Sequence, residues 1–519
     1  MLLVHGSATS RSSVAEGWSS GHVFAAAGWS AADPASRKNS AQPLNRLRHA
    51  HAGSKKQHGC RPILRQSRAL PQDRAQAQVQ AQAPANAWQT CLSSKTDFAE
   101  ALEEVIKGCT GRLGSEQPHL ALIFVSSAFA DQYHEIVPEL RRRLPSLTEV
   151  VGCSGFGVIG NDAAGPQEVE RSPAISLTLA SLPGVEVRTT LFTRANVPDA
   201  DASPMVWQDV VGVPIDTPKD TSFILMSEPT YGEIAEVIAG LDYAYPEAVK
   251  LGGLCAAASQ SAKRTLIWWS ARSDAQSFEN GLVEEGCLAL VLHGNIVIEP
   301  IIAQGCKAMS SQTWIVEEVK AKHWVMQLSR TSPSGRRLTR TPLQALQEEL
   351  QSLSADARVQ ALRSLIMGVA PDDFKDSEKL GPQDFLTRGI IGAEQSSGAL
   401  GIGDILRKGQ RLQFMTRSRE GAMSDMQTRC SSFMRSRLEA SMTGKEQPSP
   451  FGALIFSCNG RGMGLYETAA FDSRTLASYV PVPSAGFFCN GELGQVGQST
   501  YIHGFTAAIG VLRPSDPET

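Results

Sequence analysis

The chain has 519 residues, of which 42% are apolar and 19% charged, a composition typical of globular proteins with ordinary cores. Its longest apolar runs, such as CLALVL at 287–292, are far shorter than the roughly 18 residues that a membrane-spanning helix needs. The net charge is −3, and no basic stripe lies outside the first 90 residues. Neither a membrane nor a nucleic acid is therefore expected as a partner.

The first 90 residues differ in charge from the rest of the chain. They hold 11 Lys and Arg against 3 Asp and Glu, and they are rich in Ala, Ser and Gln. Arg-rich, Ser-rich and acid-poor beginnings are typical of organellar transit peptides. We therefore expect residues 1–87 to be a disordered leader that ends in an Ala/Gln-rich linker, and we expect a chloroplast location. A mitochondrial location, a cytoplasmic extension and a misassigned start are the alternatives.

The ten cysteines show neither a C-x-x-C pair nor a Cys/His spacing typical of zinc sites. This pattern predicts a chain from a reducing compartment, without a disulfide framework. No metal and no cofactor are expected.

The folded part begins with a helix and a buried strand. Asp97 precedes FAEALEEVIKG as an N-cap, and Gly108 is the expected stop of this helix. ALIFVSS at 121–127 reads as a buried strand, and HEIVPELRRRL follows as a helix that contains Pro138. VVGCSG and the strand AISLTLA at 174–180 complete the unit.

The same order of elements returns twice. FILMSE at 223–228 and ALIFSC at 453–458 each lead to a helix, a Gly-containing segment and a further strand. The first strand and the glycine are separated by 31, 29 and 33 residues in the three copies, and each first strand ends at a serine (Ser126, Ser227 and Ser457). We interpret this as a duplicated strand–helix–strand–strand unit, with coincidence among generic elements as the alternative.

The repeated unit predicts an α/β (α+β) fold of mixed sheets flanked by helices. A partial fourth copy is expected at LIMGVA, residues 365–370, followed by 385–400. GAMSDMQTRCSSFMRSRLEA at 421–440 is predicted to be an amphipathic helix that packs on the core.

Gly155-Phe-Gly157-Val-Ile-Gly160 has the G-x-G-x-x-G spacing of a dinucleotide-binding turn. Such a turn requires a helix directly after its last glycine, because the pyrophosphate binds at that helix's N-terminus. Here NDAAGPQEVERSP follows, without an apolar period. We therefore predict that these glycines permit tight turns between strands and do not bind a dinucleotide.

VVGCSGFG, KLGGLCAAAS, SCNGRG and GFFCNGELG together resemble the motifs of FIST domains, named for F-box and intracellular signal transduction proteins. The resemblance covers nearly all of the folded chain and implies a FIST N-terminal domain at 88–298, a FIST C-terminal domain at 299–512 and a tail at 513–519. It implies a sensory module that binds a small ligand, such as an amino acid or a related metabolite. The last two motifs look closest to the eukaryotic branch, in which some members carry an F-box and act in ubiquitin ligases. No F-box-like segment is found before residue 110.

The candidate ligand-binding residues lie at the glycine segments and at the ends of the first strands. They are Ser126, Gly152, Cys153, Ser154, Gly252, Gly253, Ser457, Cys458, Arg461, Gly486, Asn490, Glu492 and His503. Arg461 is expected to bind a carboxylate in a bidentate fork. Glu492 is expected to hold a ligand ammonium group. The alternatives are a surface ion pair for Arg461 and hairpin-turn chemistry for Glu492.

Two further interpretations concern the cysteines. If Cys153, Cys255, Cys458 and Cys489 converge, they suit a thiol redox sensor or a soft-metal site, although free cysteines more often pack as small hydrophobes. An enzyme with Cys458 as nucleophile, His503 as base and Glu492 as orienting group is also conceivable. We expect a non-catalytic sensor with no catalytic residues. A substrate receptor in ubiquitin-dependent degradation, binding a ligase adaptor or a degradation substrate, is the alternative.

Overall fold

The computed structural model describes residues 86–199, 201–216, 221–259, 262–272, 281–332, 334–371 and 375–516. The predicted leader therefore lies outside the described residues, except for its last two positions. Within the described part, no helix is both long and apolar enough to cross a membrane.

Three repeats of one unit form most of the structure. Each contains a leading strand, a parallel pair of central strands, a hairpin and a closing strand, with helices before and between the central strands. The first repeat consists of β1 (Ala87–Ser93), α1 (Phe98–Leu113), β2 (Leu120–Ser126), η1 (Ser127–Gln132), α2 (Tyr133–Arg143), β3 (Glu149–Gly155), β4 (Gly157–Asp162), β5 (Gly165–Glu170) and β6 (Ile175–Ser181). The second consists of β7 (Val185–Phe192), α3 (Pro204–Val211), β8 (Thr221–Ser227), α4 (Ile234–Ala244), β9 (Val249–Leu254), β10 (Leu266–Ser270), β11 (Leu282–Val283) and β12 (Cys287–Gly294).

The third repeat has the same order but carries an insertion between its leading strand and its first helix. It consists of β13 (Val297–Ala303), α7 (Arg419–Met442), β23 (Gly452–Cys458), α8 (Met463–Tyr466), α9 (Phe471–Tyr479), β24 (Ser484–Cys489), β25 (Glu492–Val496), β26 (Ser499–His503) and β27 (Ala507–Arg513). The insertion consists of β14 (Cys306–Ala308), β15 (Trp314–Lys320), β16 (Trp324–Thr331), β17 (Arg337–Arg340), α5 (Pro342–Gln351), α6 (Ala355–Arg363), β18 (Leu365–Val369), η3 (Ser377–Lys379), η4 (Pro382–Asp384), β19 (Leu386–Arg388), β20 (Ile390–Glu394), β21 (Ala399–Ile402) and β22 (Arg411–Arg417).

The insertion forms a nine-stranded sheet with a hydrophobic core of its own. β18 pairs antiparallel with β19 and β22 in this sheet. The expected partial fourth copy at 365–400 is therefore wrong, because these strands belong to an antiparallel sheet and lack the parallel central pair of the repeats. The spacing of apolar strands alone did not distinguish the two arrangements.

Local chemistry explains where the helices begin and end. The Asp97 side chain accepts a hydrogen bond from the Glu100 N–H and caps α1, as expected. The helix continues through Gly108 and ends at Gly114, whose φ of 65° suits a residue without a side chain. The expected stop at Gly108 is therefore wrong. The amphipathic helix expected at 421–440 is α7, which buries Ala422, Met426 and Cys430.

Each repeat places its hairpin in a neighbouring sheet. β4–β5 pairs with β24 of the third repeat, β10–β11 with β3 of the first, and β25–β26 with β9 of the second. The resulting six-stranded sheets run β1-β6-β2-β3-β10-β11, β26-β25-β9-β8-β12-β7 and β13-β27-β23-β24-β4-β5. The exchange is cyclic, so the three repeats form a closed ring with approximate threefold symmetry. Strands from the two sides of the predicted boundary at residue 298 pair with each other, β4 with β24 and β9 with β25, so the sheets continue across it.

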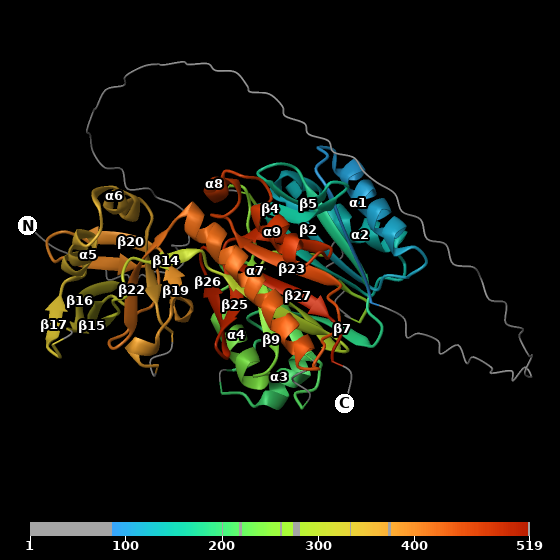
Figure 1. Ribbon diagram of the computed structural model, residues 1–519. Helices are drawn as coiled ribbons and strands as arrows, with labels where there is room; N and C mark the ends of the chain where they lie inside the picture. The colour runs from blue at the N-terminus through green and yellow to red at the C-terminus, as the bar shows by residue number, and fades with distance from the viewer. Residues whose placement is uncertain are drawn as a thin grey trace, which may run out of the picture. The chain divides into compact units, whose positions relative to one another are not determined.

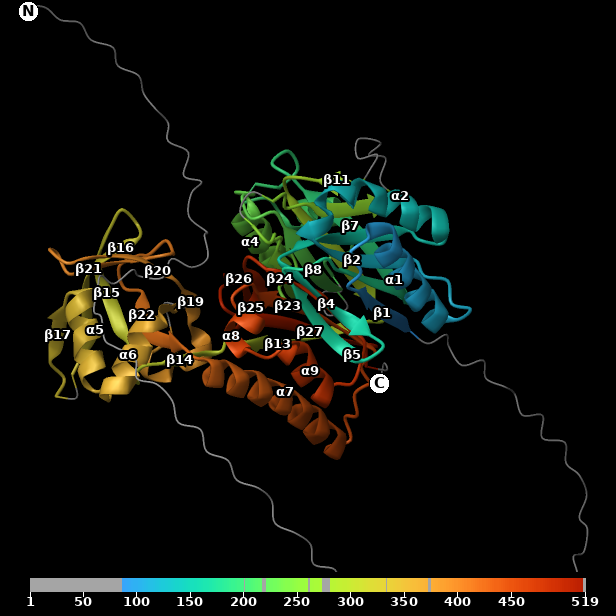
Figure 2. The same cartoon turned by 90° about the horizontal axis from the view of Figure 1, so that it is seen from above.

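The three sheets enclose one common core, and each is covered outside by its own helices. The common core, here called the inner core, draws residues from all three sheets, including Phe124, Met226 and Phe456. The outer faces form separate clusters with α1 and α2, with α3 and α4, and with α7 and α9. Figures 1 and 2 show these helices on three different sides of the sheets. The expected mixed α/β fold is confirmed.

Three equivalent glycines lie inside the second central strands. Gly152, Gly252 and Gly486 pair with Ile123, Leu225 and Ile455, respectively. A Cβ atom on any of the three would lie 1.8 Å from the carbonyl oxygen of that partner. The glycines thus allow a close approach of two backbones.

The G-x-G-x-x-G run lies where the chain passes from β3, which ends at Gly155, into β4, which runs from Gly157 through Gly160 and pairs with β5. A strand occupies the place where a dinucleotide turn requires a helix. The prediction that this run is not such a turn is confirmed.

Candidate functional site

The first central strands of the three repeats end at equivalent positions with different chemistry. Ser126, Glu228 and Cys458 each donate their backbone N–H to the carbonyl before the closing strand, at 3.0, 3.0 and 2.9 Å. Each lies two positions beyond an inner-core residue, so that side-chain alternation along the strand places it on the inner face. Ser227 and Ser457 are equivalent to each other, but Ser126 is equivalent to the residue that follows each of them. The expected equivalence of the three serines is therefore wrong by one residue. A match of residue type at strand ends does not fix the register.

A second set of equivalent positions contains one carboxyl group. Val158, Leu266 and Glu492 pair with Phe487, Cys153 and Gly253 at the same place in the three exchanged hairpins. Val158 and Leu266 are fully buried in the inner core. Glu492 is also fully buried, and its neighbour Leu493 packs on the outer face. The third repeat therefore directs a carboxyl group inward where the other two have aliphatic side chains.

The Glu492 carboxyl has only part of its hydrogen-bonding capacity satisfied. Its Oε2 accepts a hydrogen bond of 3.0 Å from the Thr506 N–H, and the Cys458 thiol also donates to the carboxyl. Its Oε1 is buried and has no hydrogen-bond partner among the described residues. Burial raises the pKa of Glu492 to about 8, against the opposing effects of these hydrogen bonds and of the Arg461 and Arg417 charges. At neutral pH the carboxyl is therefore largely protonated.

Cys458 lies beside Glu492 at the end of β23 and is partly exposed. Burial, and secondly the Glu492 charge, raises the pKa of the thiol to about 12. The thiol therefore stays protonated at neutral pH and donates to the carboxyl.

Asn459 and Arg417 add two further unpartnered polar atoms. Asn459 Oδ1 and Arg417 Nε are buried and lack hydrogen-bond partners among the described residues. Arg417 ends β22 of the insertion, donates to the Gly460 carbonyl and lies over the Phe505 ring, 5.1 Å from its centroid. We call Arg417, Cys458, Asn459 and Glu492 the mouth cluster. Arg417 was missed from the sequence, because its contact with Gly460 joins segments that are 43 residues apart.

Arg461, expected to bind a ligand carboxylate, instead binds Asp472 of α9. Its Nε and Nη2 donate to the two carboxylate oxygens of Asp472 at 2.8 and 2.9 Å, and both side chains are fully buried. Nη1 donates to the carbonyls of Ala303 and Phe505. Ser457 and the Tyr466 hydroxyl also donate to Asp472. The expected anion-binding fork is thus filled by the protein, and we revise the prediction for Arg461 to a structural one.

His503 lies opposite Glu492 in the β25–β26 ladder. Its Nε2 is 3.0 Å from the Gly494 carbonyl oxygen, and burial lowers its pKa to about 4. The imidazole is therefore neutral, and the thiol of Cys458 contacts the Glu492 carboxyl. The Nδ1 of His503 is buried and has no hydrogen-bond partner among the described residues.

Three of the four cysteines of the glycine segments converge in the inner core. The Cys153 and Cys255 thiols hydrogen-bond each other, and Cys489 is close enough to affect both electrostatically. Cys458 lies further out, beside Glu492. Burial raises the pKa of Cys153 and Cys489 well above the usual value. No group of three or more His, Cys, Asp or Glu suitable for a metal ion occurs among the residues that the structure describes.

The remaining predicted residues are held by backbone contacts around the ring. Phe156, Ala256 and Asn490 occupy equivalent positions and donate their N–H groups to Phe488, Ser154 and Leu254, at 3.1, 3.1 and 3.0 Å. The hydroxyls of Ser126 and Ser154 accept backbone hydrogen bonds from Ala174 and Thr265. Gly253 leaves room for Cys489, whose Sγ would lie 2.5 Å from a Cβ there.

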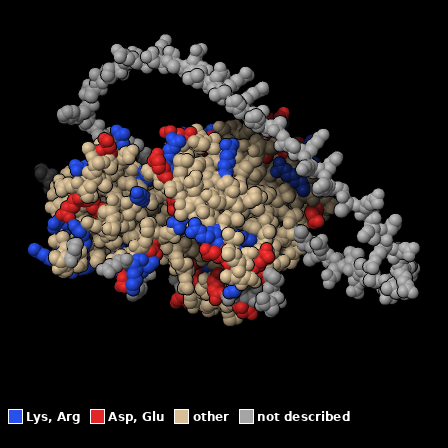
Figure 3. Space-filling view, in the orientation of Figure 1, with Lys and Arg blue, Asp and Glu red and all other residues tan. Residues whose placement is uncertain are grey.

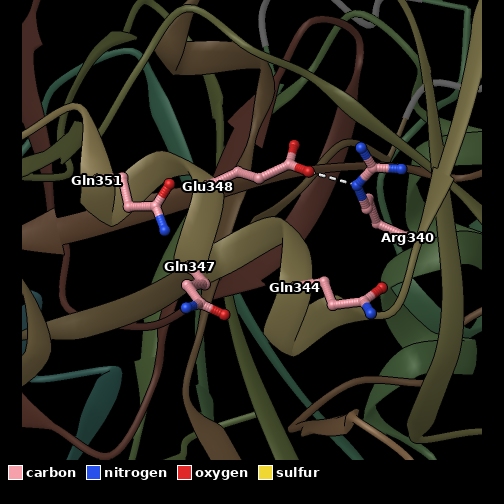
Figure 4. A pocket seen from close by; sticks show the side chains of 5 residues that line it. All are labelled: Arg340, Gln344, Gln347, Glu348 and Gln351. Carbon is pink, nitrogen blue, oxygen red and sulfur yellow. Dashed lines mark hydrogen bonds and ion pairs between the residues drawn. The ribbon is translucent and has the colours of Figure 1, made fainter.

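A separate polar pocket of about 300 Å³ lies on the insertion. Arg340, Gln344, Gln347, Glu348 and Gln351 line it, and Arg340 pairs with Glu348 across it (Figure 4). None of the predicted site residues contributes to this pocket. On the face drawn in Figure 3, the basic and acidic side chains of the described residues are interspersed and form no continuous basic stripe.

Comparison with known families identifies two adjacent domains. The FIST N domain matches residues 119–330, and the FIST C domain matches residues 342–495. The chain carries the FIST domain pair. FIST domains are sensory, ligand-binding domains of signal transduction, so this part of the expectation is confirmed. The FIST N match extends into the insertion, and the FIST C match runs from the insertion to β25, so both matched regions contribute strands to the ring.

The relatives of this FIST protein include mycobacterial proteins. It is 25% identical to the Mycobacterium tuberculosis protein Rv0628c over 428 residues, which cover 81% of this chain and 98% of that protein. It is 26% identical to Mycobacterium bovis Mb0898c over 424 residues, covering 80% and 96% of the two chains. Both relatives bear the name "uncharacterized protein". These relatives give no support to the predicted eukaryotic branch or the F-box relation.

One solved structure aligns over most of the FIST chain. It is cyanuric acid hydrolase from A. caulinodans, with 9% identity and coverage of 83% of this chain and 100% of that chain. The TM-score of 0.27 is too low to support an argument about fold or activity.

Proposed function

We propose that this protein is a non-catalytic sensor that binds a small ligand at the mouth cluster. The observation that carries the proposal is Glu492, a fully buried carboxyl with an unpartnered oxygen at a position where the other two repeats have Val158 and Leu266. An unsatisfied buried polar group costs about 1–3 kcal/mol. A ligand that donates a hydrogen bond to Oε1 offsets this cost, whereas an aliphatic residue would avoid it in a purely structural position.

The charges of the mouth cluster favour a ligand with both a donor and an acid group. Glu492 accepts a hydrogen bond or an ammonium group, and the guanidinium of Arg417 faces an anionic group. Asn459 Oδ1 accepts a further hydrogen bond. An amino acid or a related metabolite has this combination, with Arg417 in the role that the sequence suggested for Arg461.

The same geometry favours binding over catalysis. Because the pKa of the Cys458 thiol is raised to about 12, almost none of it is the thiolate that covalent catalysis needs at neutral pH, and His503 Nε2 lies 3.0 Å from the Gly494 carbonyl oxygen. Burial and hydrogen bonding instead suit recognition, since a site built from polar groups discriminates strongly against ligands that leave them unpaired.

The test is thermal unfolding of the full chain against amino acids, organic acids and amines, with Glu492→Gln and Glu149→Gln variants. Glu149 is a matched control, because it is a fully buried carboxyl outside the mouth cluster, at the first residue of β3. Burial raises its pKa to about 7. A ligand at 100 times its Kd adds about 2.7 kcal/mol of stability. We expect a stabilising ligand whose effect is lost in Glu492→Gln and retained in Glu149→Gln. Equal effects in all three proteins, or no stabilising ligand, would contradict the proposal.

A further inference from the structure

Two thiols outside the mouth cluster lie together between α1 and the first sheet. Cys91 of β1 pairs with Leu177 of β6 in the antiparallel register, and the Cys109 thiol of α1 donates to the Leu177 carbonyl at 3.2 Å. The two thiols also hydrogen-bond each other. The Cys91 and Cys109 side chains therefore lie together beside Leu177 of β6.

The surroundings provide room and charge for this pair. A Cβ on Gly108 would lie 2.5 Å from the Cys91 Sγ, so the glycine before Cys109 makes the space that Cys91 occupies. Arg112 lies one helical turn after Gly108 in α1. It donates to the Thr90 carbonyl at 2.8 Å, which keeps its guanidinium next to Cys91. Glu104 is the opposing charge nearby.

The two thiols differ in protonation. The hydrogen bond from Cys109 lowers the pKa of Cys91, and the Arg112 charge acts in the same direction against burial and Glu104. Burial raises the pKa of Cys109 well above the usual value. A thiolate is the nucleophile in thiol chemistry, so Cys91 is the attacking member of the pair.

The inner-core pair Cys153 and Cys255 provides an internal contrast. These thiols also hydrogen-bond each other, but no cation is among the groups that act on Cys153, whereas the Arg112 charge acts on Cys91. β1, in contrast, is the edge strand of the first sheet, where local opening requires the least disruption.

We propose that Cys91 and Cys109 are a redox-active dithiol that low-molecular-weight disulfides oxidise to a bond between β1 and α1. The Cys91 thiolate attacks one sulfur of the small disulfide and releases its other half as a thiolate. Cys109 then loses its proton to solvent, and its sulfur attacks Cys91 in the mixed disulfide, releasing the second small thiol. Two protein thiols are oxidised, and one small disulfide is reduced to two thiols.

The test is incubation of the native full chain with glutathione disulfide, followed by alkylation in denaturant and peptide mass spectrometry. We expect a disulfide-linked pair of peptides containing Cys91 and Cys109, while Cys153 and Cys255 remain alkylated as free thiols. Free Cys91 and Cys109 after prolonged incubation, or preferential linkage of Cys153 to Cys255, would overturn the proposal.

Two single variants test the order of attack. Cys109→Ser should accumulate a glutathione adduct on Cys91, because the resolving thiol is absent. Cys91→Ser should leave Cys109 unmodified. Equal adduct formation on either remaining thiol would contradict the assigned roles, and unchanged melting temperatures of the reduced variants would show that both fold normally.

Discussion

At the scale of single residues, the site depends on departures from the threefold repeat. Val158 and Leu266 fill the inner core where Glu492 brings a carboxyl, and Ser126 stands where the third repeat has Cys458. Because repeats of one unit preserve packing positions, a buried polar residue in one copy alone is a stronger indication of function than the same residue in an unrepeated fold.

The raised pKa of Glu492 predicts a pH dependence of stability. Between pH about 4.5 and about 8, the folded state keeps a proton that the unfolded state has lost, so the stability falls as the pH rises. Glu492→Gln lacks this proton and should be less sensitive to pH. Urea unfolding should show that the wild type loses about 1.4 kcal/mol per pH unit relative to the variant within this window. Parallel curves for the two proteins would contradict the assigned protonation.

The buried pair Arg461–Asp472 predicts a strongly non-additive double-mutant cycle. Arg461→Met leaves the Asp472 carboxylate unpaired in the interior and should cost about 3–5 kcal/mol of unfolding free energy. Asp472→Leu together with Arg461→Met removes both charges and should cost less than the sum of the single variants. Additive losses in chemical denaturation would show that the pair is not coupled.

The structure brings Glu492 and Cys458 together as neighbours, and the ligand-binding role expected for them stays a prediction. Residue-level prediction failed for the partner of Arg461. Asp472 lies 11 residues away on α9, and nothing in SCNGRG shows that a carboxylate from the following helix fills the guanidinium fork. The sequence did not single out Arg417, because its partner Gly460 lies in another segment of the chain.

At the scale of elements, the equivalent glycines determine how closely the central strands approach. Gly152, Gly252 and Gly486 were found from the sequence as spaced landmarks, and the 31-, 29- and 33-residue intervals correctly predicted the repeated unit. Their place inside strands was not predicted. A glycine that permits a turn and a glycine that permits backbone contact look alike without the partner strand.

Gly252→Ala tests this close approach. The added Cβ would lie 1.8 Å from the Leu225 oxygen, so one strand must move, and we expect a loss of about 3 kcal/mol or more. Gly232→Ala in the same repeat is the control, since a Cβ there would have nothing within 4 Å. Similar thermal unfolding of the two variants would contradict the role assigned to the strand glycines.

At the scale of the whole molecule, cyclic hairpin exchange makes the three repeats interdependent. The sequence revealed the repeats but not the exchange, because strand pairing between repeats leaves no local pattern in any one of them. It also missed the insertion as a sheet with its own core. The insertion contributes Arg417 to the mouth cluster, and its Thr387 hydroxyl donates to the Gly504 carbonyl two residues before Thr506.

This closure predicts one cooperative unfolding unit for the ring. Native-state hydrogen exchange should give the same opening free energy for the protected amides of β2, β8 and β23, because no repeat can open without disrupting a neighbouring sheet. The insertion, with its separate core, should exchange with a lower opening free energy. Clearly different opening free energies for the three strands would show that the repeats unfold independently.

The most direct test of the account is calorimetric titration of the full chain, at pH 7 in buffers of different ionisation enthalpy, with the best-stabilising amine-bearing ligand. An ammonium group bound to Glu492 favours the carboxylate, so binding should release a proton from a group with a pKa of about 8. We predict proton release in the wild type and in Glu149→Gln, and none in Glu492→Gln. Binding without proton exchange in the wild type, or the same release in Glu492→Gln, would contradict Glu492 as the ligand anchor.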